Sequence, residues 1–128
     1  MSENVLDASA ILALIQKERG AEKLTDEIMD DAIISTVNLA EVQSKLIKNG
    51  YDSEEAWETA TSLVTSAEPY TSEQARIAGD LILKTEKYGL SLGDRSCLAL
   101  AISLKASVYT TEQIWRNLKL GIPIHVIR

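Results

Sequence analysis

Short apolar segments alternate with helical patterns along this chain of 128 residues, and that alternation constrains the fold most. Apolar runs of strand length occupy residues 3–6, 32–35, 107–110 and 122–127. Strands that alternate with helices favour a parallel sheet with helices on both faces. Between 53 and 106 successive helical patterns predict a helical subregion, interrupted by an extended segment at 68–70. Helices are expected over residues 9–18, 20–30, 36–50, 53–67, 71–89, 93–106 and 112–120.

Length and composition favour one domain spanning residues 1–128, since no repeat, low-complexity stretch or Pro/Gly-rich linker divides the chain. No segment approaches the roughly 18 consecutive apolar residues of a membrane span. The first residues lack the basic region and cleavage site of a signal peptide. The single cysteine, Cys97, excludes an internal disulfide and is expected in the core. A cytoplasmic protein without membrane association is therefore expected.

Charge and motif content narrow the function classes. The net charge of -6 argues against nucleic-acid binding by a generally basic surface, although a metal-carboxylate enzyme can meet nucleic acid through its cations. With a single histidine, His125, neither a histidine-dependent triad nor a His/Cys zinc site is supported. No P-loop or G-x-G-x-x-G motif occurs, so the nucleotide-binding fingerprints are absent.

Four acidic residues follow the apolar segments, and they are the main functional candidates. Asp7 follows NVL, Asp94 follows YGLSLG, Glu112 follows SVYTT, and Glu41 lies just past AIISTV in NLAEV. Ligands of open parallel sheets bind at the carboxyl ends of the strands. Two unit charges about 4 Å apart repel by roughly 4 kcal/mol at an effective dielectric constant of about 20. Carboxylates gathered there are expected to need divalent cations.

Asp94 has the strongest support from its surroundings. The helix that follows it is apolar on almost every side, which is typical of a buried helix. A buried carboxylate without a partner is costly, so a functional partner would explain it. The alternative is an N-cap aspartate bonded to its own helix.

The other acids have stronger structural alternatives. Asp7, with Ser9 two residues later, also suits a helix N-cap. Glu41 is predicted opposite the apolar side of its helix, where a solvated glutamate is usual. Thr110 with Gln113 fits a capping box, and Glu112 in a first helical turn complements the helix dipole.

Taken in order, these segments resemble the PIN domain family, and more narrowly the VapC-type toxins of toxin-antitoxin pairs. The resemblance rests on VLDASAILALI, NLAEV, LSLGDRSCLALA and VYTTEQIW, and it covers essentially the whole chain. The fourth segment departs from the family, which more often has Asp where this chain has Glu112.

The resemblance implies a three-layer α/β/α sandwich with a mainly parallel central sheet and a metal-dependent endoribonuclease. Asp7 and Asp94 would be the main ligands of Mg²⁺ or Mn²⁺, and Glu41 would hold a second ion or position the attacking water. Glu112 would complete the catalytic set by supporting the site, often through water. Ser9 and Thr110 match polar positions beside these acids and would support the site. Apart from the resemblance, the positive charge of Arg95 suits site support or contact with a phosphate backbone. The resemblance also implies an RNA substrate, a cognate antitoxin and a homodimer.

Three other functions remain open from the sequence. One is a stand-alone PIN nuclease in RNA processing. A second is a non-catalytic binding module with the same fold, which the acidic net charge and Glu112 favour. A phosphatase with an aspartate nucleophile is the third and weakest candidate. Such an enzyme would require a second Asp two residues after Asp7, where this chain has Ser9.

Overall fold

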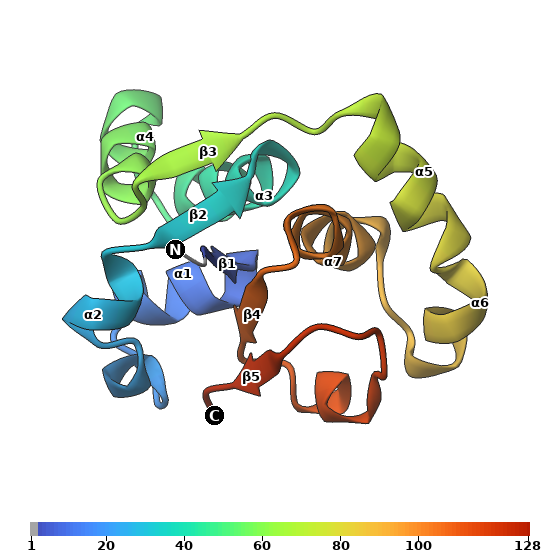
Figure 1. The fold of residues 1–128 in the computed structure, drawn as a ribbon. Helices are drawn as coiled ribbons and strands as arrows, with labels where there is room; N and C mark the ends of the chain where they lie inside the picture. Colours follow the sequence, from blue (N-terminus) through green and yellow to red (C-terminus); the bar gives the residue numbers. More distant parts are fainter. Residues whose placement is uncertain (1–2) are drawn as a thin grey trace.

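A five-stranded parallel sheet forms the centre of the computed structural model, which describes residues 3–128 (Figure 1). The strand order is β3-β2-β1-β4-β5, and every neighbouring pair is parallel. The predicted parallel α/β architecture is therefore confirmed. The strands are β1 (Asn4–Leu6), β2 (Ala32–Ser35), β3 (Ser66–Glu68), β4 (Ser107–Thr110) and β5 (Ile124–Val126).

Strand β1 lies at the middle of the sheet, and the chain order reverses beside it. Val5 is in register with Ile33 of β2 on one side and with Val108 of β4 on the other. The chain builds the sheet outward through β2 and β3, and then returns to build β4 and β5. In open α/β sheets such a switch point opens a crevice at the carboxyl ends of the strands.

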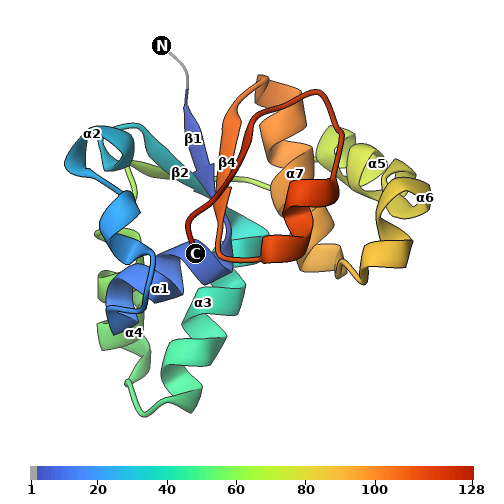
Figure 2. The same ribbon diagram turned by 90° about the horizontal axis from the view of Figure 1, so that it is seen from below.

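Helices cover both faces of the sheet (Figure 2). They are α1 (Ala8–Gln16), α2 (Asp26–Met29), α3 (Thr36–Lys48), α4 (Ser53–Thr61), α5 (Ser72–Asp80), α6 (Ile82–Thr85) and α7 (Leu92–Leu104). Three 3-10 helices add η1 (Ala21–Lys23), η2 (Glu86–Tyr88) and η3 (Gln113–Asn117). None of the helices in the described residues is long and apolar enough to cross a membrane.

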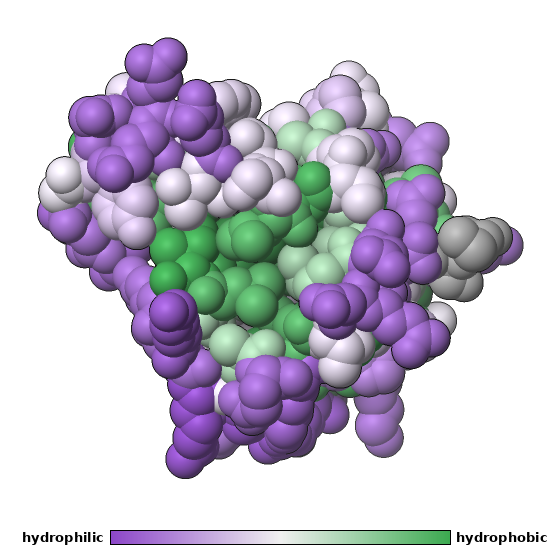
Figure 3. Space-filling model, turned by 90° about the vertical axis from the view of Figure 1, so that its left-hand side faces the viewer, coloured by the Kyte–Doolittle hydropathy of each residue, from purple (hydrophilic) through white to green (hydrophobic). Residues whose placement is uncertain are grey.

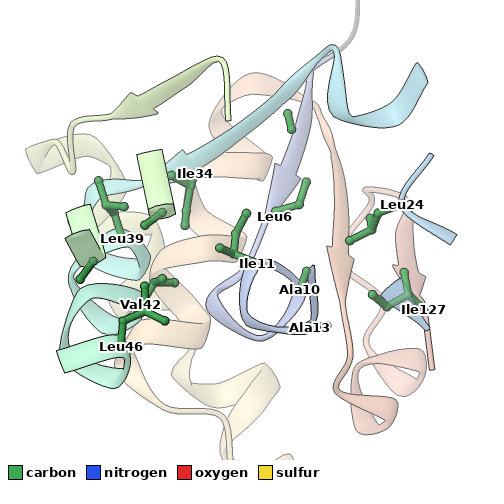
Figure 4. Packing of buried hydrophobic residues seen from close by; sticks show 13 residues of the cluster. Leu6, Ala10, Ile11, Ala13, Leu24, Ile34, Leu39, Val42, Leu46 and Ile127 are labelled. Atoms are coloured by element: carbon green, nitrogen blue, oxygen red, sulfur yellow. The ribbon is translucent and has the colours of Figure 1, made fainter. Parts of the chain in front are cut away.

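The two faces of the sheet carry separate hydrophobic cores, because successive residues of a strand point to opposite sides. Leu6 and Ile34 pack with α1, α3 and α4 in the first core (Figure 4). Val5, Ile33 and Val108 pack with α7 in the second. These two cores, with the sheet between them, make the three-layer α/β/α sandwich.

Helix α7 is buried on nearly all sides, as the sequence predicts. Every residue from Cys97 to Ala101 is at most 1% exposed. The helix contacts α5 and α3 as well as strands β1, β2 and β4. Its first turn, which carries Asp94, therefore points from the protein interior toward the crevice beside β1.

Several predicted helices are shorter than expected. The expected helix at 71–89 is broken into α5, α6 and η2, and the hydroxyl of Thr85 donates to the carbonyl of Leu81 at the break. The expected helix at 20–30 is two short pieces, η1 and α2. The expected helix at 53–67 ends at Thr61, because the chain must reach β2 and pair as β3. The extended segment predicted at 68–70 accordingly begins earlier, at Ser66.

Candidate active site

Asp7 is fixed directly after β1, at the centre of the sheet. It is the N-cap of α1, and its Oδ1 accepts from the backbone N–H of Ala10 at 2.9 Å. The same oxygen accepts from the Ser9 hydroxyl at 2.7 Å, and Oδ2 accepts from the Thr110 hydroxyl at 2.6 Å. The residue is only 3% exposed. The predicted cap is confirmed, and the cap side chain is also a buried carboxylate at the switch point.

Thr110 and Ser9 connect β4 to this carboxylate. The Thr110 oxygen accepts from the backbone N–H of Glu112 at 3.0 Å, and the Ser9 oxygen accepts from that of Thr111 at 3.0 Å. Thr110 therefore does not form the predicted capping box with Gln113. Its hydroxyl is used across the sheet instead, and η3 begins at Gln113, with Glu112 as an N-cap that makes no side-chain hydrogen bond. The two hydroxyls hold the strand end after β4 against the Asp7 carboxylate.

Burial changes the protonation of Asp7. Removal from water raises the pKa of this carboxyl from 3.8 to about 6, although the hydrogen bonds from Thr110, Ser9 and Ala10 act in the opposite direction. The nearby charge of Asp94 raises the pKa further. Asp7 is therefore a carboxylate that a cation would stabilise.

Asp94 lies in the first turn of α7 and is half-buried. The N-cap of α7 is Ser91. The predicted alternative, in which Asp94 is itself the N-cap, is therefore wrong. Asp94 Oδ2 accepts from the Ser91 backbone N–H at 2.9 Å, and the Ser91 hydroxyl accepts from the Asp94 N–H at 3.1 Å. This capping box holds the carboxylate at the positive end of the helix. The segment before Asp94 is a loop after η2 and not a strand.

Glu41 is held against the first turn of α7 by a residue that the sequence analysis missed. Asn38 is 1% exposed, and its Nδ2 donates to Glu41 Oε1 at 2.7 Å and to the Gly93 carbonyl at 3.0 Å. Gly93 has no side chain, and a Cβ there would collide with the Glu41 carboxylate. The only sequence signal for Asn38 is a polar residue next to Leu39 on the buried side of α3.

Three of the four predicted acids act electrostatically on buried groups. The Asp94 charge acts on Asp7, and the charges of Asp7, Asp94 and Glu41 all raise the pKa of the Cys97 thiol, after burial as the largest cause. Cys97 is buried in α7, where the charges of these carboxylates reach it. Within residues 3–128, however, no three His, Cys, Asp or Glu side chains are close enough together to hold a metal ion.

The side chains of Glu112 and Arg95 make no hydrogen bond to the other predicted site residues in the described part of the chain. Glu112 is exposed, and its side chain makes no hydrogen bond to the described residues. Arg95 donates through Nη1 to the Ala78 carbonyl at 2.9 Å, which ties α7 to α5. The structure thus brings together Asp7, Ser9 and Thr110 through hydrogen bonds. It places Asp94 and Glu41 nearby, each held by contacts at the start of α7.

The residues present suit a divalent cation such as Mg²⁺ or Mn²⁺. Asp7, Asp94 and Glu41 offer carboxylate oxygens, the ligands that hard cations prefer. The buried Oδ1 of Asn38 lacks a hydrogen-bond partner within the described part of the chain. Such an orphaned acceptor is suited to a water molecule or a cation-bound water at this site.

The fold is similar to that of solved toxin-antitoxin proteins. A chain of VapBC from Salmonella typhimurium, in a complex with DNA, is 18% identical, with a TM-score of 0.73 and 97% of each chain covered. A chain of VapBC2 from Rickettsia felis, bound to a promoter fragment, is 17% identical, with a TM-score of 0.72 and 94% of this chain and 96% of that chain covered. A chain of VapBC-5 from Mycobacterium tuberculosis is 21% identical, with a TM-score of 0.68 and coverage of 100% and 99%.

Among curated protein sequences, none matches this chain. The profile of the PIN domain matches residues 5–119, a span that contains all four acids and both hydroxyls of the site. The chain therefore belongs to the PIN domain family.

Proposed function

We propose that this protein is a divalent-metal-dependent endoribonuclease that acts as the toxin of a type II toxin-antitoxin pair. The observation that carries the proposal is Asp7, a buried carboxylate fixed by three donors beside the charge of Asp94. Its hydrogen bonds offset the burial only in part, since the pKa of this carboxyl is still raised to about 6, and a bound cation would stabilise the charged form further. The PIN family membership supports the nuclease activity.

Each residue of the site has a separate role in this proposal. Asp7 and Asp94 hold Mg²⁺ or Mn²⁺, and Glu41 holds a second ion or orients the attacking water. Ser9 and Thr110 fix the Asp7 carboxylate through hydrogen bonds and keep both of its oxygens in place. Asn38 restrains Glu41. A bound cation supplies charge stabilisation for the phosphodiester and acidifies water near neutral pH. Glu112, which is exposed, has only a supporting role.

Cleavage of structured RNA by the purified protein tests the nuclease activity. Cleavage is expected with Mg²⁺ or Mn²⁺, and it should be lost with EDTA. The variants Asp7→Asn and Asp94→Asn should be inactive, whereas the surface variant Glu54→Gln should cleave like the parent. Full activity in both aspartate variants would rule out this mechanism.

The antitoxin proposal is supported by the solved VapBC proteins and by an apolar face of this chain. Figure 3 shows an apolar face rimmed by hydrophilic side chains, on the side that carries α4 and α2 in Figure 1. Helix α1 passes between them, and its half-buried stripe of Ala8, Leu12 and Ile15 repeats at helical spacing. Leu39 and Val42, by contrast, are core residues. We assign the antitoxin to this face, as an amphipathic segment that covers the stripe.

Co-expression with the product of a neighbouring small reading frame tests the toxin role. Growth arrest should follow expression of this chain alone, and the second protein should relieve it. The variant Leu12→Ser should weaken the complex, whereas Leu104→Ser, at the 42% exposed end of α7, should not. Circular dichroism confirms that both variants fold. Arrest that no neighbouring product relieves would favour a stand-alone PIN nuclease in RNA processing.

A non-catalytic module with this fold is the second candidate, and the exposed Glu112 favours it. Calorimetry with Mn²⁺ separates the two, since a module would bind no metal at millimolar concentration. A single domain over 1–128, a homodimer and a cytoplasmic location are further parts of the proposal. Size-exclusion chromatography with light scattering tests the dimer.

A further inference from the structure

A hollow on the α6 side of the molecule lies outside the acidic site. It has a volume of about 500 Å³ and opens between the α6–η2 segment and the residues that follow η3. Lys84 and Lys87 contribute from the first wall, and Asn117 and Lys119 from the second. An adjoining hollow of about 310 Å³ shares Lys84 with it and contains Asp80.

The charge of this hollow is opposite to that of the protein as a whole. Lys84, Lys87 and Lys119 are all exposed, and no carboxylate is among the described residues that line it. In the described part of the chain the only ion pair joins Arg128 to Glu18, so none of the three lysines is paired within 4 Å. Three lysines without a carboxylate partner, in a chain of net charge -6, are complementary to an anionic ligand.

The hollow also carries an aromatic surface beside its lysines. Tyr88 is half-buried, and the Lys87 Nζ lies 5.1 Å from the centre of its ring. Leu83, beside it, is 80% exposed. Lysines that follow a backbone, together with an aromatic ring on which a base can stack, are the combination found in grooves that bind single-stranded nucleic acid.

Both walls of the hollow lead to the acidic site. Tyr88 ends η2 three residues before Ser91, which caps the helix that carries Asp94. Asn117 ends η3, which begins after Glu112. Figure 2 shows the start of α7 between α6 and the point where the chain passes from β1 into α1. A strand held in the hollow can therefore continue toward the carboxylates.

We propose that this hollow binds the phosphate backbone of single-stranded RNA beside the cleavage site. The three lysines contact phosphates, and Tyr88 provides the stacking surface for one base. The inference rests on the proposed nuclease function and adds a substrate subsite to it. It also explains how a chain of acidic composition can hold a polyanion: the cations are concentrated where the substrate enters.

Binding of a fluorescent 20-nucleotide single-stranded RNA, followed by anisotropy in EDTA, tests the hollow without cleavage. The variant with Lys84→Gln, Lys87→Gln and Lys119→Gln should bind at least tenfold more weakly. The slope of log affinity against log salt should fall by about 2, since each phosphate contact with a single strand contributes about 0.7. The variant Tyr88→Leu should lose at least fivefold. The matched control with Lys17→Gln, Lys23→Gln and Lys48→Gln has the same net charge, and it should stay within twofold of the parent.

Cleavage assays on the same proteins separate this inference from the proposed function. If the parent cleaves RNA and the hollow variant binds RNA as tightly as the parent, the hollow is not the subsite and the nuclease function stands. If the parent binds RNA through the hollow but does not cleave, the subsite stands and the nuclease function falls. If the hollow variant keeps its RNA affinity and loses antitoxin binding instead, the hollow is a protein-docking site and this inference is wrong.

Discussion

The two halves of the acidic site are built in different ways. On the β1 and β4 side, Asp7 is 3% exposed, and both of its oxygens accept hydrogen bonds from fixed neighbours. On the α3 and α7 side, Asp94 is half-buried and bonds to the N–H of Ser91, whereas Glu41 is exposed and held by Asn38. In the first half three donors hold one carboxylate, and in the second each carboxylate has a single donor.

This difference follows from the elements that carry the acids. A residue between a central strand and a helix is immobilised by the sheet on one side and by the helix N-terminus on the other. A carboxylate in a first helical turn needs only its own helix to satisfy it. In the proposed function, Asp7 would therefore be the most firmly positioned of the three metal ligands.

The largest effects are expected at the two aspartates. Their asparagine variants should change the free energy of unfolding in opposite directions. Asp7→Asn and Asp94→Asn should each lower RNA cleavage at least 100-fold. At pH 7 without metal, Asp7→Asn should be more stable than the parent by up to about 3 kcal/mol, because it removes a desolvated charge. Asp94→Asn should be less stable by under about 1 kcal/mol, because it weakens the capping box. Urea unfolding measures both, and a destabilised Asp7→Asn protein would contradict the comparison.

The pH dependence of folding tests the Asp7 half alone. The pKa of Asp7 is higher in the folded protein, about 6, than its ordinary value of 3.8, so the unfolded chain loses this proton first. This contribution to stability is fully present below pH 3.8 and is lost as the pH rises through 6. The loss is about 3 kcal/mol at about 1.4 kcal/mol per pH unit. The unfolding free energies of parent and Asp7→Asn, measured in EDTA from pH 4 to 7, should diverge across this window and nowhere else.

Gly93→Ala tests the second half through the position of Glu41. The new methyl group would displace the Glu41 carboxylate, whereas alanine in a helix is more favourable than glycine by roughly 0.5–1 kcal/mol. Cleavage and Mn²⁺ affinity should fall about tenfold without loss of stability. Gly79→Ala in α5 is the control, because a Cβ there meets nothing within 4 Å. Unchanged Mn²⁺ affinity in Gly93→Ala would show that Glu41 has no part in metal binding.

The smallest effect is expected at Glu112. Its side chain is exposed and makes no hydrogen bond to the residues described, so its neutralisation disturbs neither half. The variant Glu112→Gln should change cleavage by less than about threefold and leave the unfolding free energy unaltered. A loss comparable to that of Asp94→Asn would place Glu112 among the metal ligands, and steady-state kinetics at several Mg²⁺ concentrations would detect it.

Local patterns in the sequence predict most of the fold and part of the site. The parallel sheet, the buried helix α7 and the cap at Asp7 follow from hydrophobic periodicity and from residue order. Ser91 and Asp94 form a capping box that the spacing S-x-x-D could have indicated. Thr110 and Gln113 have a similar spacing but no such box, because the N-cap is Glu112. The Thr110 oxygen accepts from the Glu112 N–H, and its hydroxyl donates to Asp7, 103 residues away in the chain.

What the sequence does not predict depends on contacts between distant segments. Asn38 becomes a site residue only because α3 packs against the first turn of α7, where Gly93 offers both a carbonyl and the space for Glu41. The break between α5 and α6 and the early end of α4 are set by packing and by the pairing of β3, which override local helix propensity.

Cys97 allows the opening of the protein core near the acidic site to be measured. Burial and three nearby carboxylates raise the pKa of this thiol well above its ordinary range, so the closed protein holds almost no reactive thiolate. It is the only sulfhydryl in the chain, so modification by a thiol reagent reports the exposure of this one buried residue of α7. The labelling rate therefore measures how often this residue becomes exposed. A cation held by Asp7 and Asp94 should lower the labelling rate.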